Sequence, residues 1–150
     1  MQPSKTSWRD LAVHLWPNKF YDDPSDSVGL VLSYLHFELL EAYQAGDEIN
    51  LAKIYDYAEW CYQQGKIDPE IGDSAVIHFY EHLVDVEVTY QEIPKRIKPE
   101  MFSEFGREFE YRLDEMPRKY PVQRPGTFAA LVLEYDRQNN TDFAKQWGIV

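Results

Sequence analysis

The chain of 150 residues contains a single cysteine and no long apolar run. One thiol cannot form a disulfide within the chain, so packing alone must hold the fold. Cys61 lies inside an apolar helical pattern, which predicts a buried structural thiol and not a nucleophile. No segment approaches the roughly 18 consecutive apolar residues of a membrane span. The N-terminus has no apolar segment behind its first charges, so we expect no secretory signal, no membrane partner and a cytoplasmic protein.

The sequence also lacks the short motifs of the common nucleotide, hydrolase and zinc sites. It contains no P-loop, no G-x-G-x-x-G, no G-x-S-x-G and no Cys/His spacing of a structural zinc site. Carboxylates are so numerous that no pair stands out as a general acid and its base. These absences favour a protein that is not an enzyme and has no cofactor.

Basic residues are scarce in one half of the chain. Residues 20–94 contain sixteen acidic side chains and only two basic ones, Lys53 and Lys66, which gives this half a net charge of −14. Residues 95–150 contain ten basic and nine acidic side chains, and the whole chain carries −11. An acidic surface repels nucleic acid and attracts cationic proteins. We therefore expect a basic protein partner and no nucleic-acid partner.

Apolar residues recur throughout at spacings of three and four, which is the rhythm of helices with one buried face. No alternating strand pattern is present, so the predicted class is all-α. The length suits one domain over residues 1–150, a bundle of about five to seven helices with an acidic half (20–94) and a mixed-charge half (95–150). The expected helices cover residues 8–16, 28–45, 51–64, 73–87, 99–116, 128–138 and 142–147.

Several residues mark where these helices begin and end. Ser27, with its polar neighbours, offers an N-cap for the helix from residue 28. Gly46 and Gly65 each follow a Tyr-Gln-x sequence, and we interpret both as C-caps. Pro94 and Pro99 bracket a short basic connector, where the chain cannot continue as one uninterrupted helix.

The sharpest local motif is His78-Phe-Tyr-Glu-His82, which matches the H-x-x-E-H arrangement of the inverted zinc peptidases. Two imidazoles at i and i+4 on a helix can share a zinc ion, and Glu81 between them could activate its water. His78, His82 and Asp85 are the candidate ligands in this alternative, a metal-dependent hydrolase. Only 68 residues follow His82, however, and those peptidases are large, so a polar stripe that contacts a partner is the main interpretation.

Acidic residues recur three or four positions apart on three of the central helices, and aromatic residues lie among them. Like charges three or four apart repel each other mildly and do not help folding, so they point either to a solubilising surface or to a partner. Tyr57 and Trp60 could serve as anchors beside the carboxylates, or could instead pack on a neighbouring helix. The predicted partner-binding residues are Asp56, Tyr57, Glu59, Trp60, His78, Glu81, His82 and Asp85.

The stretches Tyr-Ala-Glu-Trp-Cys (57–61) and Phe-Tyr-Glu-His-Leu (79–83) resemble the core of a family of small uncharacterised bacterial proteins. The resemblance implies a compact helical fold with no catalytic motif. In size and acidity the chain is also similar in kind to immunity proteins, which cover the basic active site of a nuclease toxin. The expected function is thus a protein-binding module, most concretely an immunity-type inhibitor of a cognate toxin. A zinc hydrolase and a scaffold or regulatory subunit are the alternatives.

Overall fold

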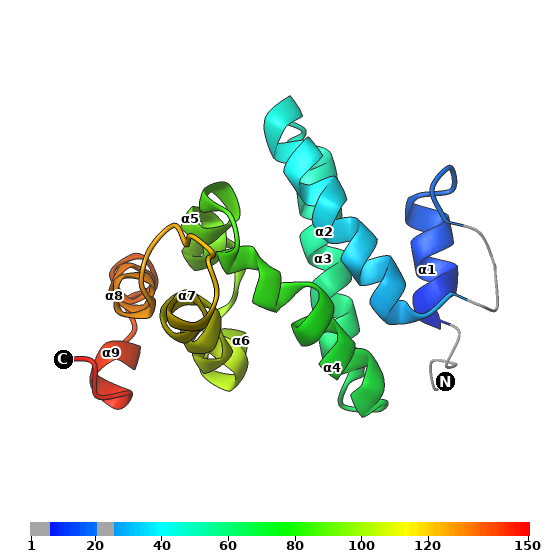
Figure 1. Cartoon of the computed structure of the whole chain (residues 1–150). Helices are drawn as coiled ribbons and strands as arrows, with labels where there is room; N and C mark the ends of the chain where they lie inside the picture. The colour runs from blue at the N-terminus through cyan, green and yellow to red at the C-terminus, as the bar shows by residue number, and fades with distance from the viewer. Residues whose placement is uncertain (1–6, 21–25) are drawn as a thin grey trace. The chain divides into compact units, whose positions relative to one another are not determined.

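A computed structural model describes residues 7–20 and 26–150 (Figure 1). The chain divides into two compact units, an N-terminal unit ending at Tyr80 and a C-terminal unit beginning at Glu81. Throughout the described ranges the regular structure is helical, with no strand. The prediction of an all-α protein is confirmed. The boundary between the units falls well before the change in charge at residues 94 and 95.

The N-terminal unit packs three helices against one another and a fourth on their side. The helices are α1 (Ser7–Leu15), α2 (Val28–Ala45), α3 (Glu48–Gln64) and α4 (Pro69–His78). Helices α2, α3 and α4 contact each other, and α1 contacts α2 and α3 (Figure 1). Leu32, Leu35 and Ile54 are fully buried in this unit.

Both expected ends of α2 and the expected C-terminal end of α3 are confirmed, whereas α3 begins at Glu48, earlier than the expected residue 51. The two glycines act differently. The Ser27 side chain accepts a hydrogen bond from the Leu30 amide, and Gly46 adopts the left-handed conformation with φ 64°. Gly65 is right-handed, with φ −57°. A Cβ atom there would lie 2.9 Å from the Cα atom of Gly72, so Gly65 is required by the close approach of α3 and α4.

The C-terminal unit surrounds a core of aromatic rings. Phe102 stacks on Tyr135 with 3.8 Å between ring centroids, and Phe143 lies against both. The Tyr135 hydroxyl donates to the Ile97 carbonyl at 2.6 Å. The longer helices are α5 (Glu87–Arg96), α6 (Pro99–Phe105) and α8 (Phe128–Asn139), and the short ones are α7 (Met116–Lys119) and α9 (Phe143–Gln146).

The single helix expected over residues 73–87 is wrong. The α4 helix ends at His78, a 3₁₀ helix η1 (Tyr80–Val84) follows, and α5 begins at Glu87. Phe79 and Tyr80 are both buried, as are Leu83 and Val84. Phe79 leaves the helical conformation, with φ −124° and ψ −67°, so the backbone changes direction here.

The continuous helix expected over residues 99–116 is also wrong. The α6 helix ends at Phe105, and a 3₁₀ turn η2 (Gly106–Glu108) and a π-helical turn η3 (Tyr111–Glu115) follow. Pro117 lacks an amide hydrogen, and in a regular α-helix its ring would clash with the carbonyl four residues earlier. The wider turn avoids this clash, and the Met116 amide bonds to the carbonyl five residues back, that of Tyr111.

The basic connector predicted at residues 95–98 is shorter than expected. Pro94 lies within α5, which continues to Arg96. The Pro94 carbonyl accepts a hydrogen bond from the Asn139 side chain at 2.9 Å. Only Ile97 and Lys98 separate α5 from α6.

Candidate functional site

A groove between α1 and α3 gathers three of the predicted partner-binding residues. Its volume is about 270 Å³. Its lining consists of Leu11, Leu15, Lys53, Asp56, Tyr57 and Trp60. The groove is therefore an apolar depression with charged side chains among its lining residues.

Of the two placements that the sequence left open for Tyr57, the structure has the packed one, because only 1% of this residue is exposed. Its hydroxyl donates to the Trp8 carbonyl at 2.8 Å, and its ring meets Trp16 edge-on. Burial also raises the pKa of Tyr57 well above its usual range. Trp60 is half-buried and stacks on Tyr57 with 6.2 Å between ring centroids. Tyr57 thus forms the floor of the groove, and Trp60 remains accessible to a partner.

Two charged side chains of the groove differ in what they contact. Lys53 donates to the Leu15 carbonyl at 3.3 Å, near the end of α1, where a positive charge is favourable. Asp56 is exposed, and within residues 7–20 and 26–150 no basic side chain lies within ion-pair distance of it. Glu59 lies nearby along α3 and is half-buried. Asp56 is therefore the carboxylate in this groove that is open to a partner.

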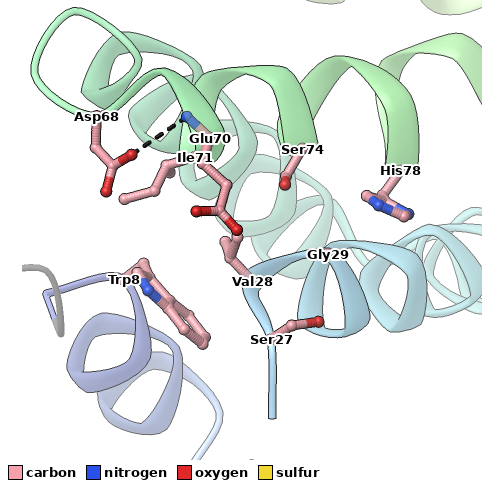
Figure 2. A pocket seen from close by; sticks show the side chains of 9 residues that line it. All are labelled: Trp8, Ser27, Val28, Gly29, Asp68, Glu70, Ile71, Ser74 and His78. Atoms are coloured by element: carbon pink, nitrogen blue, oxygen red, sulfur yellow. Dashed lines mark hydrogen bonds between the residues drawn. The ribbon is translucent and has the colours of Figure 1, made fainter.

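His78 lies apart from this groove, at a second pocket of about 430 Å³ on the same unit (Figure 2). Its Nδ1 atom is 3.3 Å from the Ser33 hydroxyl. A Cβ atom on Gly29 would lie 2.7 Å from its Nε2 atom, so the imidazole packs directly on the backbone of α2. The pocket is lined by Trp8, Ser27, Val28, Gly29, Asp68, Glu70, Ile71, Ser74 and His78.

The helical metal face predicted for the H-x-x-E-H motif is wrong. The α4 helix ends at His78, so His78 and His82 do not stand one turn apart on a regular helix. His82 lies in η1, where its Nδ1 atom is 2.9 Å from an Asp85 carboxylate oxygen. Among the residues whose placement is described, no group of three His, Cys, Asp or Glu side chains could hold a metal ion.

Asp85 is held by two arginines of the C-terminal unit. Arg112 donates to both carboxylate oxygens, at 3.1 and 2.8 Å, and Arg124 approaches one of them at 3.0 Å. Burial opposes the charge of Asp85, but hydrogen bonds from His82 and Arg112 prevail and lower its pKa to about 2. Arg124 also donates to the Arg112 carbonyl at 2.9 Å. The cluster joins the end of η1 to the π turn and to the segment before α8.

Glu81, the third polar member of the motif, lies beside this cluster and is half-buried. Burial raises its pKa, while the nearby Arg112 lowers it. No sequence pattern identified Arg112 and Arg124 as partners of Asp85. Their distance along the chain, 27 residues from Asp85 for Arg112, left no local signal to find them.

Cys61 is fully buried, as predicted for a structural thiol. Burial raises the pKa of Cys61 to about 12. The thiolate that acts as a nucleophile is therefore scarce at neutral pH. The described part of the chain contains no helix that is long and apolar enough to cross a membrane.

These features define a class of protein: an all-helical chain with an acidic N-terminal unit and, after the motif, an Asp85 carboxylate that is engaged in internal ion pairs. The chain belongs to the family described as Domain of unknown function (DUF7674), which matches residues 18–112. The match includes both stretches on which the sequence resemblance rests, and it confirms membership of an uncharacterised family. It leaves out α1, which forms one wall of the groove. No curated protein and no solved structure matches the chain.

Proposed function

We propose that the chain is a non-enzymatic protein-binding module whose N-terminal unit binds a basic partner, most concretely as an immunity-type inhibitor of a toxin. The observation that carries the proposal is the exposed Asp56 carboxylate at an apolar groove, on the more acidic unit. Residues 1–80 contain thirteen acidic and five basic side chains, a net charge of −8, whereas residues 81–150 carry only −3.

The groove suits a long basic side chain. Its volume of about 270 Å³ and its leucine and aromatic lining fit the aliphatic stem of a lysine or arginine. The charged end of such a side chain would meet Asp56, and the half-buried Trp60 would contact its stem. Complementary charge over the whole unit would raise the association rate by about 10–10³-fold.

The internal contacts of two of the predicted partner-binding residues favour α3 as the proposed surface. Asp85 and His82 are engaged within the C-terminal unit, so they contribute less to a partner than the sequence predicted. The pairing of Asp85 with Arg112 also weighs against a zinc hydrolase, because a guanidinium occupies the oxygens that a metal would need. A scaffold or regulatory subunit would use the same surface, and only the activity of the bound partner distinguishes it from an inhibitor.

The test is to purify the partner from the native host at low salt and then to measure association kinetics. Asp56→Lys with Glu59→Lys should slow association and flatten its dependence on salt, because the Debye length is about 10 Å at 0.1 M salt and shrinks as salt rises. Glu100→Lys with Glu104→Lys, two exposed charges on α6, is the matched control. A partner whose association ignores salt and both reversals would overturn the proposal, and an unimpaired toxin activity in the complex would overturn the inhibitor role.

A further inference from the structure

The α2 helix presents a row of exposed apolar side chains to solvent. Leu30, Tyr34 and Phe37 follow one another at i, i+4 and i+7 and are 57%, 40% and 68% exposed. These spacings place them on one face of the helix, and the exposed Glu41 continues the row by one turn. Large exposed apolar groups gathered on one face are typical of an interaction surface. We call Leu30, Tyr34 and Phe37 the α2 stripe.

The other faces of α2 are occupied within the N-terminal unit. Leu32, Leu35 and Leu39 are completely buried on the core side. Along a second side, Gly29 and Ser33 contact the His78 ring of α4. The α2 stripe is thus an additional apolar face, and folding of the unit leaves it exposed.

One member of the stripe is also held in place from outside the helix. Tyr34 meets the Phe20 ring edge-on at 5.4 Å, and the Lys19 ammonium lies 6.0 Å from the Tyr34 ring. Lys19 itself is paired with Glu38 at 3.1 Å. A surface whose central ring is fixed in advance loses less side-chain entropy when a partner binds.

We propose that the α2 stripe is a docking surface for a basic amphipathic helix of the partner, which places its apolar side chains on Leu30, Tyr34 and Phe37. This inference rests on the proposed function. An 18-residue helix with an exposed apolar row is the kind of surface that a partner helix covers through side chains at i, i+3, i+4 and i+7. The net charge of −8 on the same unit favours a helix whose remaining face is basic.

The same charge weighs against two other occupants. A second copy of the chain would bring two strongly acidic units together, and an anionic membrane surface would repel them as well. A neutral apolar helix would not exploit the charge. The basic amphipathic helix is the occupant that suits both the apolar row and the net negative charge of the unit.

The probe is a fluorescent synthetic peptide of about 15 residues with leucines at helical spacing and lysines elsewhere. Its binding to the full chain is followed by anisotropy at low salt. Leu30→Gln with Phe37→Gln should weaken binding by about tenfold or more, since central apolar contacts dominate such interfaces. Ile49→Gln with Ile67→Gln changes two isoleucines of the same unit that are 80% and 59% exposed, and it should change binding by less than about twofold. Circular dichroism establishes that all variants are folded.

The outcomes separate this inference from the function on which it rests. Salt-sensitive binding that is lost in the stripe variant and kept in the isoleucine variant supports both. Salt-sensitive binding that is equal in the two variants overturns the stripe and leaves the acidic surface standing. Equal binding of a matched leucine–glutamate peptide, or no salt-sensitive binding at all, overturns both. Self-association of the chain that only the stripe variant abolishes would identify a second copy as the occupant and overturn the inference.

Discussion

At the scale of single residues, Asp85 was expected on a partner-binding surface but forms ion pairs within its own unit. Arg112 and Arg124 approach its two oxygens, and their side chains are only 19% and 9% exposed. Removing the carboxylate would leave two largely buried positive charges close together. Removing the carboxylate would lower the stability of the fold, because the buried arginines would lose water contacts without gaining an opposite charge.

We therefore expect Asp85→Asn to lower the free energy of unfolding by about 2 kcal/mol, below the roughly 3–5 kcal/mol for fully buried pairs because this cluster keeps some contact with water. Urea unfolding at neutral pH measures the difference. Glu134→Gln, in the exposed pair with Arg137, is the control and should change stability little. A loss no larger than that of the control would show that the arginines do not depend on Asp85.

The Asp85 carboxylate should also make the stability of the fold depend on pH. Hydrogen bonds from His82 and Arg112 outweigh the opposing effect of burial and lower the pKa of Asp85 from 3.8 to about 2 in the folded chain. Between these values the unfolded chain binds the proton more readily, so the stabilisation is present above about pH 4 and is lost as pH falls toward 2. The stability advantage of the native chain over Asp85→Asn should shrink over that window. A constant difference down to pH 2 would contradict this assignment.

At the scale of elements, the crossing of α3 and α4 depends on two glycines. Gly65 follows α3 and Gly72 lies in the first half of α4, and each would place a Cβ atom within 3 Å of the Cα atom of the other. Backbone atoms cannot rotate away as side chains do, so any side chain here must separate the helices. The Tyr62 carbonyl, 3.0 Å from the same Cβ position on Gly65, adds a second constraint.

Gly65→Ala should therefore destabilise the fold by about 1–3 kcal/mol, as overpacking usually does, although alanine favours helix more than glycine. Gln64→Ala, one position earlier and half-buried, is the matched control and should be close to neutral. Thermal or urea unfolding distinguishes the two variants. If Gly65→Ala stabilises the chain, helix propensity outweighs the close approach, and this account of the crossing is wrong.

At the scale of the whole molecule, the charge acts against the fold. The chain carries −11, most of it on the N-terminal unit, and like charges at this density repel one another. Attractive pairs exist, but several are exposed and contribute little, such as Lys95 with Glu92 and Arg107 with Glu110. The net long-range electrostatic effect on stability is repulsive.

Salt should consequently stabilise the chain. Raising sodium chloride from about 0.02 M to about 0.3 M shortens the Debye length and screens the repulsion, so the melting temperature should rise by a few degrees. Differential scanning calorimetry measures the melting temperature at each salt concentration. The variant with Asp56→Lys and Glu59→Lys should show a smaller rise in melting temperature. A melting temperature that falls with salt would mean that attractive pairs dominate instead.

The sequence predicted well those parts of the fold that depend on neighbouring residues. The helices that begin at Val28 and Phe128 lie where apolar spacing placed them, and Ser27 caps the first as expected. The left-handed cap at Gly46 follows from its lack of a side chain. It failed at residues 73–87, because Phe79 leaves the helical conformation and the chain continues as η1 and α5. For the candidate site, it left open whether Tyr57 and Trp60 are exposed or packed, and the burial of Tyr57 depends on α1, whose Trp8 carbonyl accepts its hydrogen bond.

What the sequence alone determined is therefore the helical class, most helix ends and the segregation of acidic charge, since periodicity, capping and composition are local properties of the chain. The tertiary structure decided which polar residues are engaged and which are open. Asp85 meets Arg112 only after 27 intervening residues have folded back, and the same packing leaves Leu30 and Phe37 in solvent. Distances between remote segments are set by the packing of helices on one another, which no pattern of neighbouring residues encodes.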